Sequence, residues 1–390
     1  MKEAVAGELA AAYDSQLVDQ VRRDDYTFAS GRLTIHLARE FGFCYGVDRA
    51  VDYAYQARRR FPGRNVFLTG EIIHNPHVND RLRAEGIRFL SDPGEDASTL
   101  GSDDVVILPA FGVTVGDMAK LSHQGCTLVD TTCGSVLNVW KNVIRYAKDG
   151  FTSIIHGKFK HEETQATASQ ATKFPNAHYL VVLDREEAAI VCDYIRHGGD
   201  AKAFLGRFAH AASPGFDPDR DLVRVGCANQ TTMLMTESLE IGEMVGAAMK
   251  DRYGEAALPE HFRAFDTICS ATQERQDAVI ALLEGQALDM MVVVGGYNSS
   301  NTCNLARICA ERVPTFHIAE PDGLTSPRVI RHRPVGAPST ATGIEVTTGD
   351  WLPSSGALTV GLTAGASTPN NIVGEVIRRL DRYANVPASP

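Results

Sequence analysis

The sequence of 390 residues predicts an α/β protein of three related units with mainly parallel sheets. Three cysteines each open a helix-like stretch, a short apolar run follows each stretch, and each run ends in a polar loop. The spacings from cysteine to loop are 30, 28 and 30 residues, for Cys44 to His74, Cys133 to His161, and Cys269 to Ser299. A period that recurs three times indicates related structural units.

The N-terminal segment 1–31 is predicted to be a helical arm packed on the body, because Leu9, Ala12, Leu17 and Val21 lie near helical spacing. This segment has no apolar core of a secretory signal, and it carries acidic residues that transit peptides lack. Eight cysteines lie far apart without the spacing of a disulfide scaffold, so we expect a reducing, cytoplasmic location.

The first predicted unit spans 32–128. It begins with the strand-like run RLTIHLAREFGFC at 32–44, which leads into the first cysteine. A helix is expected over 47–60 and a strand over 65–69. The continuous apolar run at 103–113 is typical of a buried parallel strand.

The second unit is predicted over 129–264 and the third over 265–390. The apolar runs TSIIHG, HYLVVL and DLVRVGC provide the strands of the second unit, and MMVVVGG, TFHIAE and ALTVGL those of the third. Two segments rich in proline and glycine are expected to be loops, 207–220 and 330–351.

A second strand of each unit ends in a turn rich in glycine, serine or threonine, namely PAFGVTV, ANQTTM and TAGASTP. Ligands of parallel α/β sheets bind beyond the carboxyl ends of the strands. If the units pack around an axis, three thiols meet at one point with polar loops nearby. That arrangement suits a metal cluster beside a pocket for a polar ligand.

The charge balance argues against nonspecific binding to nucleic acid or to an anionic membrane surface. The chain has 38 basic and 48 acidic residues, a formal net charge of −10 and a pI of about 5.7. No apolar run reaches the length of a membrane span. We therefore expect neither a nucleic acid nor a membrane as a partner.

Cys44, Cys133 and Cys269 occupy equivalent places in the repeat and are the candidate metal ligands. One alternative is that the three cysteines are buried residues at helix starts. Another is a structural zinc site, which requires a fourth ligand and usually has local C-x-x-C pairs. Three separated thiolates fit a [4Fe–4S] cluster with one iron open to a substrate oxygen. By contrast, Cys192 and Cys227 follow apolar runs and are expected to be small buried side chains.

The polar loops predict a cradle for an anion, most simply a phosphate. His74 and His161 follow equivalent strands, and the third unit offers the NSSN loop and a glycine-rich turn with Ser367. Backbone N–H groups at such turns and at helix N-termini bind anions. One of the two glutamates after His161 is a candidate proton donor, and Thr231 is expected to contact the ligand.

Eight stretches across residues 33–380 make the chain resemble the LytB/IspH family of 4-hydroxy-3-methylbut-2-enyl diphosphate reductases. They are GFCYGVDRA, GEIIHN, DTTC, HGKFKHEET, ANQTTM, DTICSATQERQDAV, GGYNSSNTCNLA and GLTAGASTP. The resemblance implies three α/β units around a pseudo-threefold axis, with a central [4Fe–4S] cluster on the three repeat cysteines. It also implies that the diphosphate is held by His74, His161, Ser299, Ser300, Asn301 and Ser367.

The same resemblance assigns Glu163 as the proton-relay acid and Thr231 as the residue that orients the substrate hydroxyl. The common bacterial form has a histidine in an A-H-G-V-like turn, whereas this chain has Phe111, which cannot donate to phosphate. The Ala-Phe-Gly turn, the HGKFKHEET wording and the arm resemble the longer form of plants and cyanobacteria.

The implied activity is reductive dehydroxylation of 4-hydroxy-3-methylbut-2-enyl diphosphate to isopentenyl and dimethylallyl diphosphate, with reduced ferredoxin or flavodoxin as electron donor. One alternative is another open-iron enzyme similar to quinolinate synthase. Two others are a non-enzymatic iron–sulfur sensor and a zinc-stabilised binding protein. The HEET and NSSN wording favours the reductase, and the oligomeric state stays open.

Overall fold

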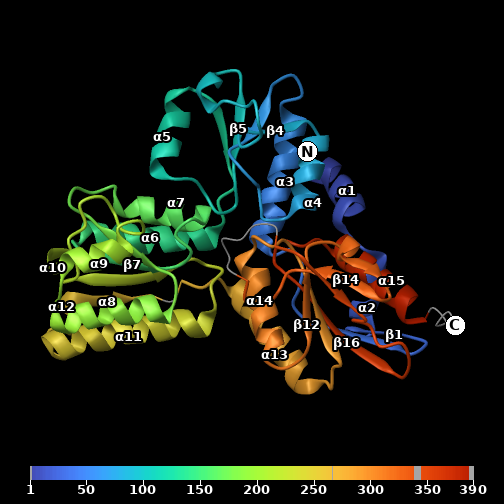
Figure 1. Ribbon diagram of the computed structural model, residues 1–390. Coiled ribbons are helices and arrows are strands. Elements are labelled where there is room, and N and C mark those ends of the chain that lie inside the picture. Colours follow the sequence, from blue (N-terminus) through green and yellow to red (C-terminus); the bar gives the residue numbers. More distant parts are fainter. Residues whose placement is uncertain (1, 266, 338–343, 386–390) are drawn as a thin grey trace. The chain divides into compact units, whose positions relative to one another are not determined.

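The chain, drawn as a ribbon in Figure 1, folds into two compact units. Unit 1 combines Met1–Phe89 with Ser270–Pro390, and unit 2 is Leu90–Cys269. The division into an arm and three repeated units stays a prediction. The computed structural model describes residues 2–265, 267–337 and 344–385.

The main sheet of unit 1 has five strands in the order β1-β2-β16-β11-β12. The hairpin pair β1–β2 is antiparallel and the other neighbours are parallel. The strands are β1 (Thr27–Ser30), β2 (Leu33–Leu37), β11 (Met290–Val294), β12 (Thr315–Ile318) and β16 (Leu358–Ala364). Because Leu358 pairs with Leu33, segments from the two ends of the chain lie side by side in this sheet.

Helices cover both faces of this sheet, and β11 shows the alternation that makes this possible. Its residues Met290, Val292 and Val294 pack in the core under α2 and α15, whereas Met291 and Val293 pack against α13 and α14. These helices are α2 (Gln16–Arg23), α13 (Ser270–Gly285), α14 (Ser300–Ala310) and α15 (Asn370–Asn385). The continuous apolar run in the sequence thus reflects a strand that is buried on both faces.

The structure corrects the prediction that segment 1–31 is wholly helical, because the described part of this segment contains two helices and a strand. The helix α1 (Lys2–Tyr13) ends before Ser15, whose side chain caps α2 by accepting from the Val18 N–H. The last part of the segment forms β1 and joins the main sheet. The arm packs on the body, as expected, because Val18 and Val21 belong to the core of unit 1.

Unit 1 also contains a small antiparallel sheet that corrects the expectation of a loop over 330–351. The strand β15 and all but the first residue of β14 lie inside that segment, and residues 338–343 are outside the described part of the chain. The remaining elements are α3 (Tyr45–Arg60), β3 (Val66–Leu68), α4 (Pro76–Ala84), β4 (Ile87–Phe89), the 3-10 turn Pro321–Gly323, β13 (Leu324–Ser326), β14 (Val329–His332) and β15 (Val346–Gly349).

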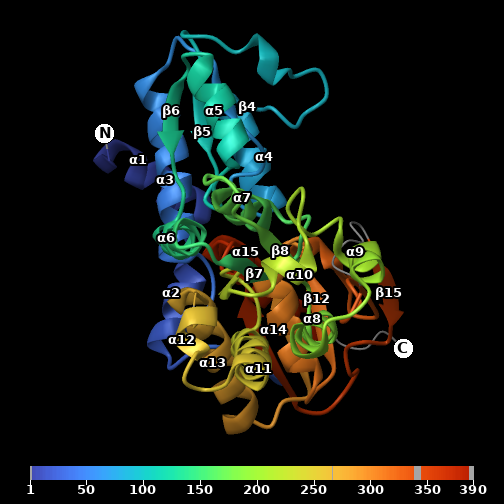
Figure 2. The same cartoon turned by 90° about the vertical axis from the view of Figure 1, so that its left-hand side faces the viewer.

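Unit 2 is built on a wholly parallel sheet in the order β10-β9-β7-β8. The helices α6 and α7 pack on one face and α8 and α11 on the other (Figure 1; Figure 2). The strands are β7 (Thr152–His156), β8 (Tyr179–Val182), β9 (Val225–Asn229) and β10 (Phe262–Ala264). The four helices are α6 (Gly134–Lys148), α7 (Glu162–Ala171), α8 (Arg185–His197) and α11 (Met235–Tyr253).

The prediction of an α/β fold with mainly parallel sheets is confirmed. A further parallel pair, β5 with β6, precedes the sheet of unit 2. The expected loop at 207–220 contains the end of α9 and the start of α10, joined by a turn. The remaining elements of unit 2 are the 3-10 turn Ala97–Thr99, β5 (Val105–Leu108), α5 (Val115–His123), β6 (Thr127–Asp130), α9 (Ala201–Phe208), α10 (Pro218–Asp221) and α12 (Leu258–His261). Within the described residues, no helix combines the length and apolarity that crossing a membrane requires.

Candidate functional site

Each of the three repeat cysteines lies directly before a helix, and its backbone N–H donates to the carbonyl of a strand-end turn. The N–O distances are 3.1 Å for Cys44 to Ala366, 2.8 Å for Cys133 to Ala110 and 3.4 Å for Cys269 to Thr231. These three turns follow β16, β5 and β9, the strands whose polar ends the sequence singled out. The repeat therefore has a structural counterpart, since the same hydrogen bond recurs at all three cysteines.

The donor set of these cysteines fits a metal cluster. All three are partly buried, and Cys44 and Cys133 occupy the N-cap positions of α3 and α6 without capping the helix through their side chains. A helix N-terminus stabilises a thiolate, which is the form that binds metal. The two cysteines expected to be core residues, Cys192 and Cys227, are buried, and burial raises their pKa to about 11 and about 12.

Within unit 1, Cys44 lines a pocket of about 460 Å³ between the arm and α3. The apolar and aromatic part of its wall includes Leu9, Tyr13 and Phe43. Tyr45, the residue after the cysteine, is 81% exposed. Solvent therefore has access to this side of the Cys44 loop.

Three of the predicted anion ligands in unit 1 are connected by hydrogen bonds to the turn at Ala366 and Ser367. The Ser367 hydroxyl donates to the backbone carbonyl of His74 at 3.3 Å, and the Ala366 N–H donates to Asn301 Oδ1 at 3.0 Å. A side chain at Gly296 would collide with that same His74 carbonyl, so the glycine permits the close approach. The loops after β3, β11 and β16 are thereby brought together.

The N-terminus of α14 carries the other predicted ligands of unit 1. Ser299 is its N-cap and accepts from the Thr302 N–H at 3.3 Å. Ser300 and Asn301 follow in the first turn, and both are 2% exposed. The Asn301 Nδ2 group has no hydrogen-bond partner among the described residues. A buried amide donor beside the N–H groups of a helix N-terminus is suited to an anion.

The two histidines of the first loop have different environments. His74 Nδ1 donates to the Glu71 carboxylate at 2.8 Å, which fixes the orientation of the ring. Burial, and next the Arg81 guanidinium, lower the pKa of His77. His77 is therefore held neutral, and His74 is the better candidate for binding an anion.

Unit 2 brings together His161, Glu163, Thr231 and Cys269. His161 is the N-cap of α7, and its Nδ1 accepts from the Glu163 N–H at 3.2 Å, so a neutral ring carries its proton on Nε2. The Glu163 carboxylate, 3% exposed, accepts from the Thr231 N–H at 2.6 Å. The Thr231 carbonyl in turn accepts from Cys269. One peptide backbone thus links the buried acid to a candidate metal ligand.

Phe111 lies where the common bacterial pattern has a histidine. Its ring is 8% exposed and meets the His161 imidazole edge to face, with 6.1 Å between the ring centroids. The preceding Ala110 carbonyl accepts from Cys133. Phe111 therefore packs against one predicted anion ligand and adds no donor of its own.

Gln230, which is not among the site residues predicted from the sequence, connects the site loops of unit 2. Its buried Oε1 accepts from the Lys158 N–H at 3.2 Å and from the Thr164 hydroxyl at 3.1 Å. Its Nε2 donates to the Thr232 hydroxyl at 2.8 Å. The signal was present in the ANQTT turn, where a large polar residue follows a buried strand.

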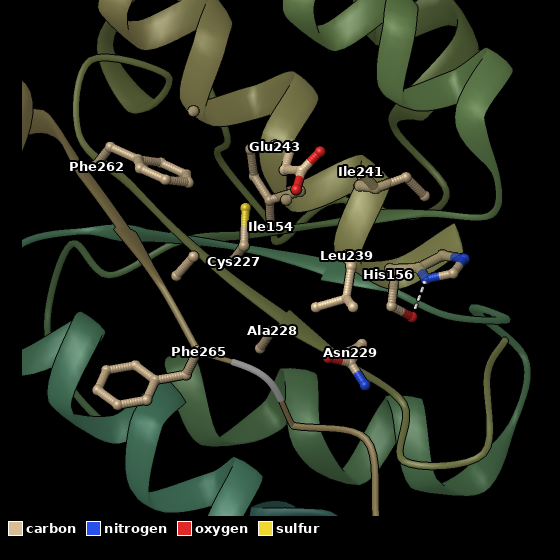
Figure 3. Close-up of a pocket in the computed structure, with 14 residues that line it drawn as sticks. Ile154, His156, Cys227, Ala228, Asn229, Leu239, Ile241, Glu243, Phe262 and Phe265 are labelled. Atoms are coloured by element: carbon tan, nitrogen blue, oxygen red, sulfur yellow. Dashed lines mark hydrogen bonds between the residues drawn. The ribbon is translucent and has the colours of Figure 1, made fainter. Parts of the chain in front are cut away.

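A separate cleft of about 250 Å³ lies between α11 and the strands β7, β9 and β10 of unit 2 (Figure 3). Its wall is mainly apolar, with Leu239 and Phe262 facing the opening, and at one end His156 Nδ1 and the Ser238 hydroxyl are 2.8 Å apart. Its described lining residues include none of the predicted site residues.

The protein has parallel sheets, a helix directly after each of the three repeat cysteines, and candidate anion-binding groups at the ends of strands. These features define an α/β protein whose residues are suited to bind a metal cluster and an anion. A family profile described as LytB protein matches residues 35–381. The chain belongs to the LytB family.

Curated relatives named 4-hydroxy-3-methylbut-2-enyl diphosphate reductase are similar over nearly the whole chain. The protein of Gloeobacter violaceus is 52% identical over 387 residues, covering 97% of this chain and 90% of the relative. That of a Synechococcus strain is 50% identical over 381 residues, covering 97% and 92%. The resemblance to the cyanobacterial form is thereby confirmed.

Two solved structures share the fold. One is titled as (E)-4-hydroxy-3-methyl-but-2-enyl diphosphate reductase, the terminal enzyme of the non-mevalonate pathway. It is 25% identical with a TM-score of 0.55, and the match covers 89% of this chain and 99% of that one. The Plasmodium falciparum reductase, 20% identical with a TM-score of 0.62 over 88% and 86% of the two chains, supports the fold alone.

Proposed function

We propose that this chain is a 4-hydroxy-3-methylbut-2-enyl diphosphate reductase of the non-mevalonate isoprenoid pathway. The reaction consumes two electrons and two protons, breaks the allylic C–O bond, releases water and leaves isopentenyl or dimethylallyl diphosphate. The observation that carries the proposal is the contact series in unit 2, in which Thr231 joins the buried Glu163 to Cys269. This series supports the proposal, because it connects a buried acid through one residue to the backbone of a candidate metal ligand.

Each unit, taken by itself, contains proposed donors to the diphosphate. In unit 1 these are the first turn of α14, Ser367 and His74. The Asn301 Nδ2 group, which has no hydrogen-bond partner among the described residues, supports this role. In unit 2 the Nε2–H of His161 is the donor, since its Nδ1 accepts from the backbone. Because Phe111 replaces a further histidine with an apolar ring, the substrate is bound with one imidazole fewer than in the common bacterial form.

Glu163 supplies protons to the substrate. Its carboxylate accepts from the Thr231 backbone, and the threonine hydroxyl is proposed to orient the substrate hydroxyl. Burial of both side chains keeps bulk water away from the proton path. A positioned acid of this kind contributes about 10²- to 10⁴-fold to a rate.

Cys44, Cys133 and Cys269 are the proposed ligands of a [4Fe–4S] cluster. When bound, the cluster would supply single electrons and an open iron that acts as a Lewis acid toward the leaving hydroxyl. The three thiols share the same position before a helix and the same backbone hydrogen bond, which fits one common role. Reduced ferredoxin or flavodoxin is the proposed electron donor, and the cytoplasm the proposed location.

The proposal is tested by turnover of the anaerobically reconstituted protein with a reduced one-electron dye as donor. Glu163→Gln should retain the iron content, the visible absorbance and substrate binding, and it should lose about 10²-fold in turnover. Glu162→Gln is the matched control, because that side chain is 56% exposed on the same helix turn. It should keep turnover within about twofold of the wild-type value.

Two results would contradict the proposal. A wild-type protein with a full cluster that leaves the substrate unchanged would exclude the reductase activity. Near-normal turnover of Glu163→Gln would leave the activity standing and remove the role assigned to this acid.

A further inference from the structure

Arg275 is a buried arginine of α13 with an unusual set of partners. Arg275 is 3% exposed. Its guanidinium donates to the Gly42 carbonyl at 2.7 Å and to the Ala271 carbonyl at 2.8 Å. Among the described residues, its Nε has no hydrogen-bond partner and no carboxylate of unit 1 forms an ion pair with it. The charge is therefore taken out of water without a counter-ion among the described residues of its own unit.

Each of the two carbonyls belongs to a residue close in sequence to a candidate metal ligand. Gly42 lies two residues before Cys44, and Ala271 lies two residues after Cys269. One guanidinium thus contacts backbone carbonyls near two of the three repeat cysteines, one of them a turn earlier in its own helix.

The Gly42 end of this connection has little freedom to move. Gly42 has a φ of +79°, and its N–H donates to the Ala364 carbonyl at 3.4 Å. A side chain on Gly42 would approach Asn370 Oδ1 to 3.0 Å. The loop before Cys44 is therefore held from β16 on one side and by Arg275 on the other.

An isolated buried cation is costly, and buried charges are normally retained where an opposite charge compensates them. We propose that Arg275 is a positioning residue that clamps the backbone beside Cys44 and Cys269, and that its charge favours the reduced state of the cluster. A cluster held by three thiolates gains one negative charge on each one-electron reduction, and a fixed cation stabilises that added charge. This inference rests on the cluster of the proposed function.

The test is a redox titration of the reconstituted full-length protein with dithionite as the one-electron reductant, without substrate. Arg275→Met removes the charge and keeps most of the volume. We expect its equilibrium constant for one-electron reduction to fall about tenfold, a lowering of the midpoint potential by about 59 mV. Arg275→Lys keeps the charge and should stay within about twofold of the wild-type constant.

The matched control is Arg333→Met, because Arg333 is 2% exposed and also donates to a backbone carbonyl, that of Tyr297 at 2.9 Å. Its potential should not change. Wild-type potential in a fully loaded Arg275→Met protein, or equal shifts in the Met and Lys variants, would overturn the electrostatic role. If the Met variant binds no iron, a tenfold shift in Arg275→Lys would overturn it.

Because the titration needs no substrate, its outcome is separate from that of the turnover assay. An inactive wild-type protein with a cluster would contradict the proposed reductase and leave the comparison of potentials valid. An unchanged potential in an active enzyme would contradict only the role of Arg275.

Discussion

His317 is a buried histidine in β12 whose neutral form stabilises unit 1. Its Nε2–H donates to the Gly295 carbonyl at 2.9 Å, in the loop that leads to α14. Burial lowers its pKa to about 4, the bond to Gly295 opposes this shift, and Arg333 and His332 add to the lowering. The folded protein therefore takes up this proton only at a much lower pH than the unfolded chain does.

The sign of the resulting pH dependence follows from proton uptake. Between pH 6.5 and 4 the unfolded histidine binds a proton that the folded one does not, so the free energy of unfolding falls as the pH falls. The full effect is about 3 kcal/mol. His317→Gln should lose most of this dependence in urea denaturation measured at pH 7 and pH 4.5.

His197→Gln is the control for that measurement, since its side chain is 69% exposed on α8. Its pH dependence should match that of the wild-type protein. The same dependence in His317→Gln as in the wild type would contradict the role assigned to the buried ring.

The roles of site residues can be predicted from the sequence where a pattern repeats. They are harder to predict where a role depends on contacts with residues distant in the sequence. The three cysteines followed from spacing alone, and the structure gives them the same backbone hydrogen bond. The roles of Arg275 and Gln230 depend on carbonyls and side chains distant in sequence, which a single chain without contacts cannot indicate. Phe111 was recognised as a departure, but only the structure places its ring against His161.

At the level of elements, the first turn of α14 combines two tasks that substitution can separate. The Ser299 side chain caps the helix by accepting from Thr302, and it is also a proposed diphosphate ligand. Ser299→Ala removes the cap and should lower the free energy of unfolding by about 1 kcal/mol. Ser299→Asp keeps a good cap and should change stability by only a few tenths of a kcal/mol.

Catalysis should respond in the opposite order, because an aspartate in the cradle repels the diphosphate. We expect the KM of Ser299→Asp to rise more than about tenfold, and that of Ser299→Ala by only a few fold. The measurements are urea denaturation and steady-state kinetics on the same preparations. A KM for Ser299→Asp no higher than that for Ser299→Ala would exclude Ser299 from the diphosphate site.

Helices and strands can be predicted well where apolar periodicity is strong. They are predicted poorly where hydrogen-bonded pairing with another strand determines the structure. The helix expected over 47–60 is α3, Tyr45–Arg60, and the run expected as a strand over 32–44 is a strand only from Leu33 to Leu37. Its remainder bends at Gly42, whose positive φ suits glycine. The composition of the segment did not predict β14 and β15, because their stability comes from pairing with each other and with β13.

At the scale of the whole molecule, unit 1 is assembled from both ends of the chain. β2 belongs to the first predicted unit and pairs with β16 of the third, and Cys44 is hydrogen-bonded to the turn after β16. The cysteine of the first predicted repeat is therefore hydrogen-bonded to the strand-end turn of the last one. A linear division of the sequence cannot represent this exchange.

The second predicted unit, 129–264, is different because all four strands of its parallel sheet and the helices on both faces lie within it. We therefore predict that the excised segment 129–264 folds alone, whereas 265–390 does not. The latter lacks β2, which leaves β16 as a bare edge and removes Leu33, Ile35 and Leu37 from the core of the main sheet.

Urea denaturation followed by circular dichroism distinguishes the two segments. Segment 129–264 should unfold in one cooperative transition with an m-value of about 1 to 3 kcal/mol/M. Segment 265–390 should show a shallow transition or aggregate, and adding residues 1–44 to it through a flexible linker should restore cooperativity by supplying β1 and β2. Gradual unfolding of 129–264 would mean that the parallel sheet depends on residues outside it. Cooperative folding of 265–390 alone would mean that β2 is dispensable for the core of unit 1.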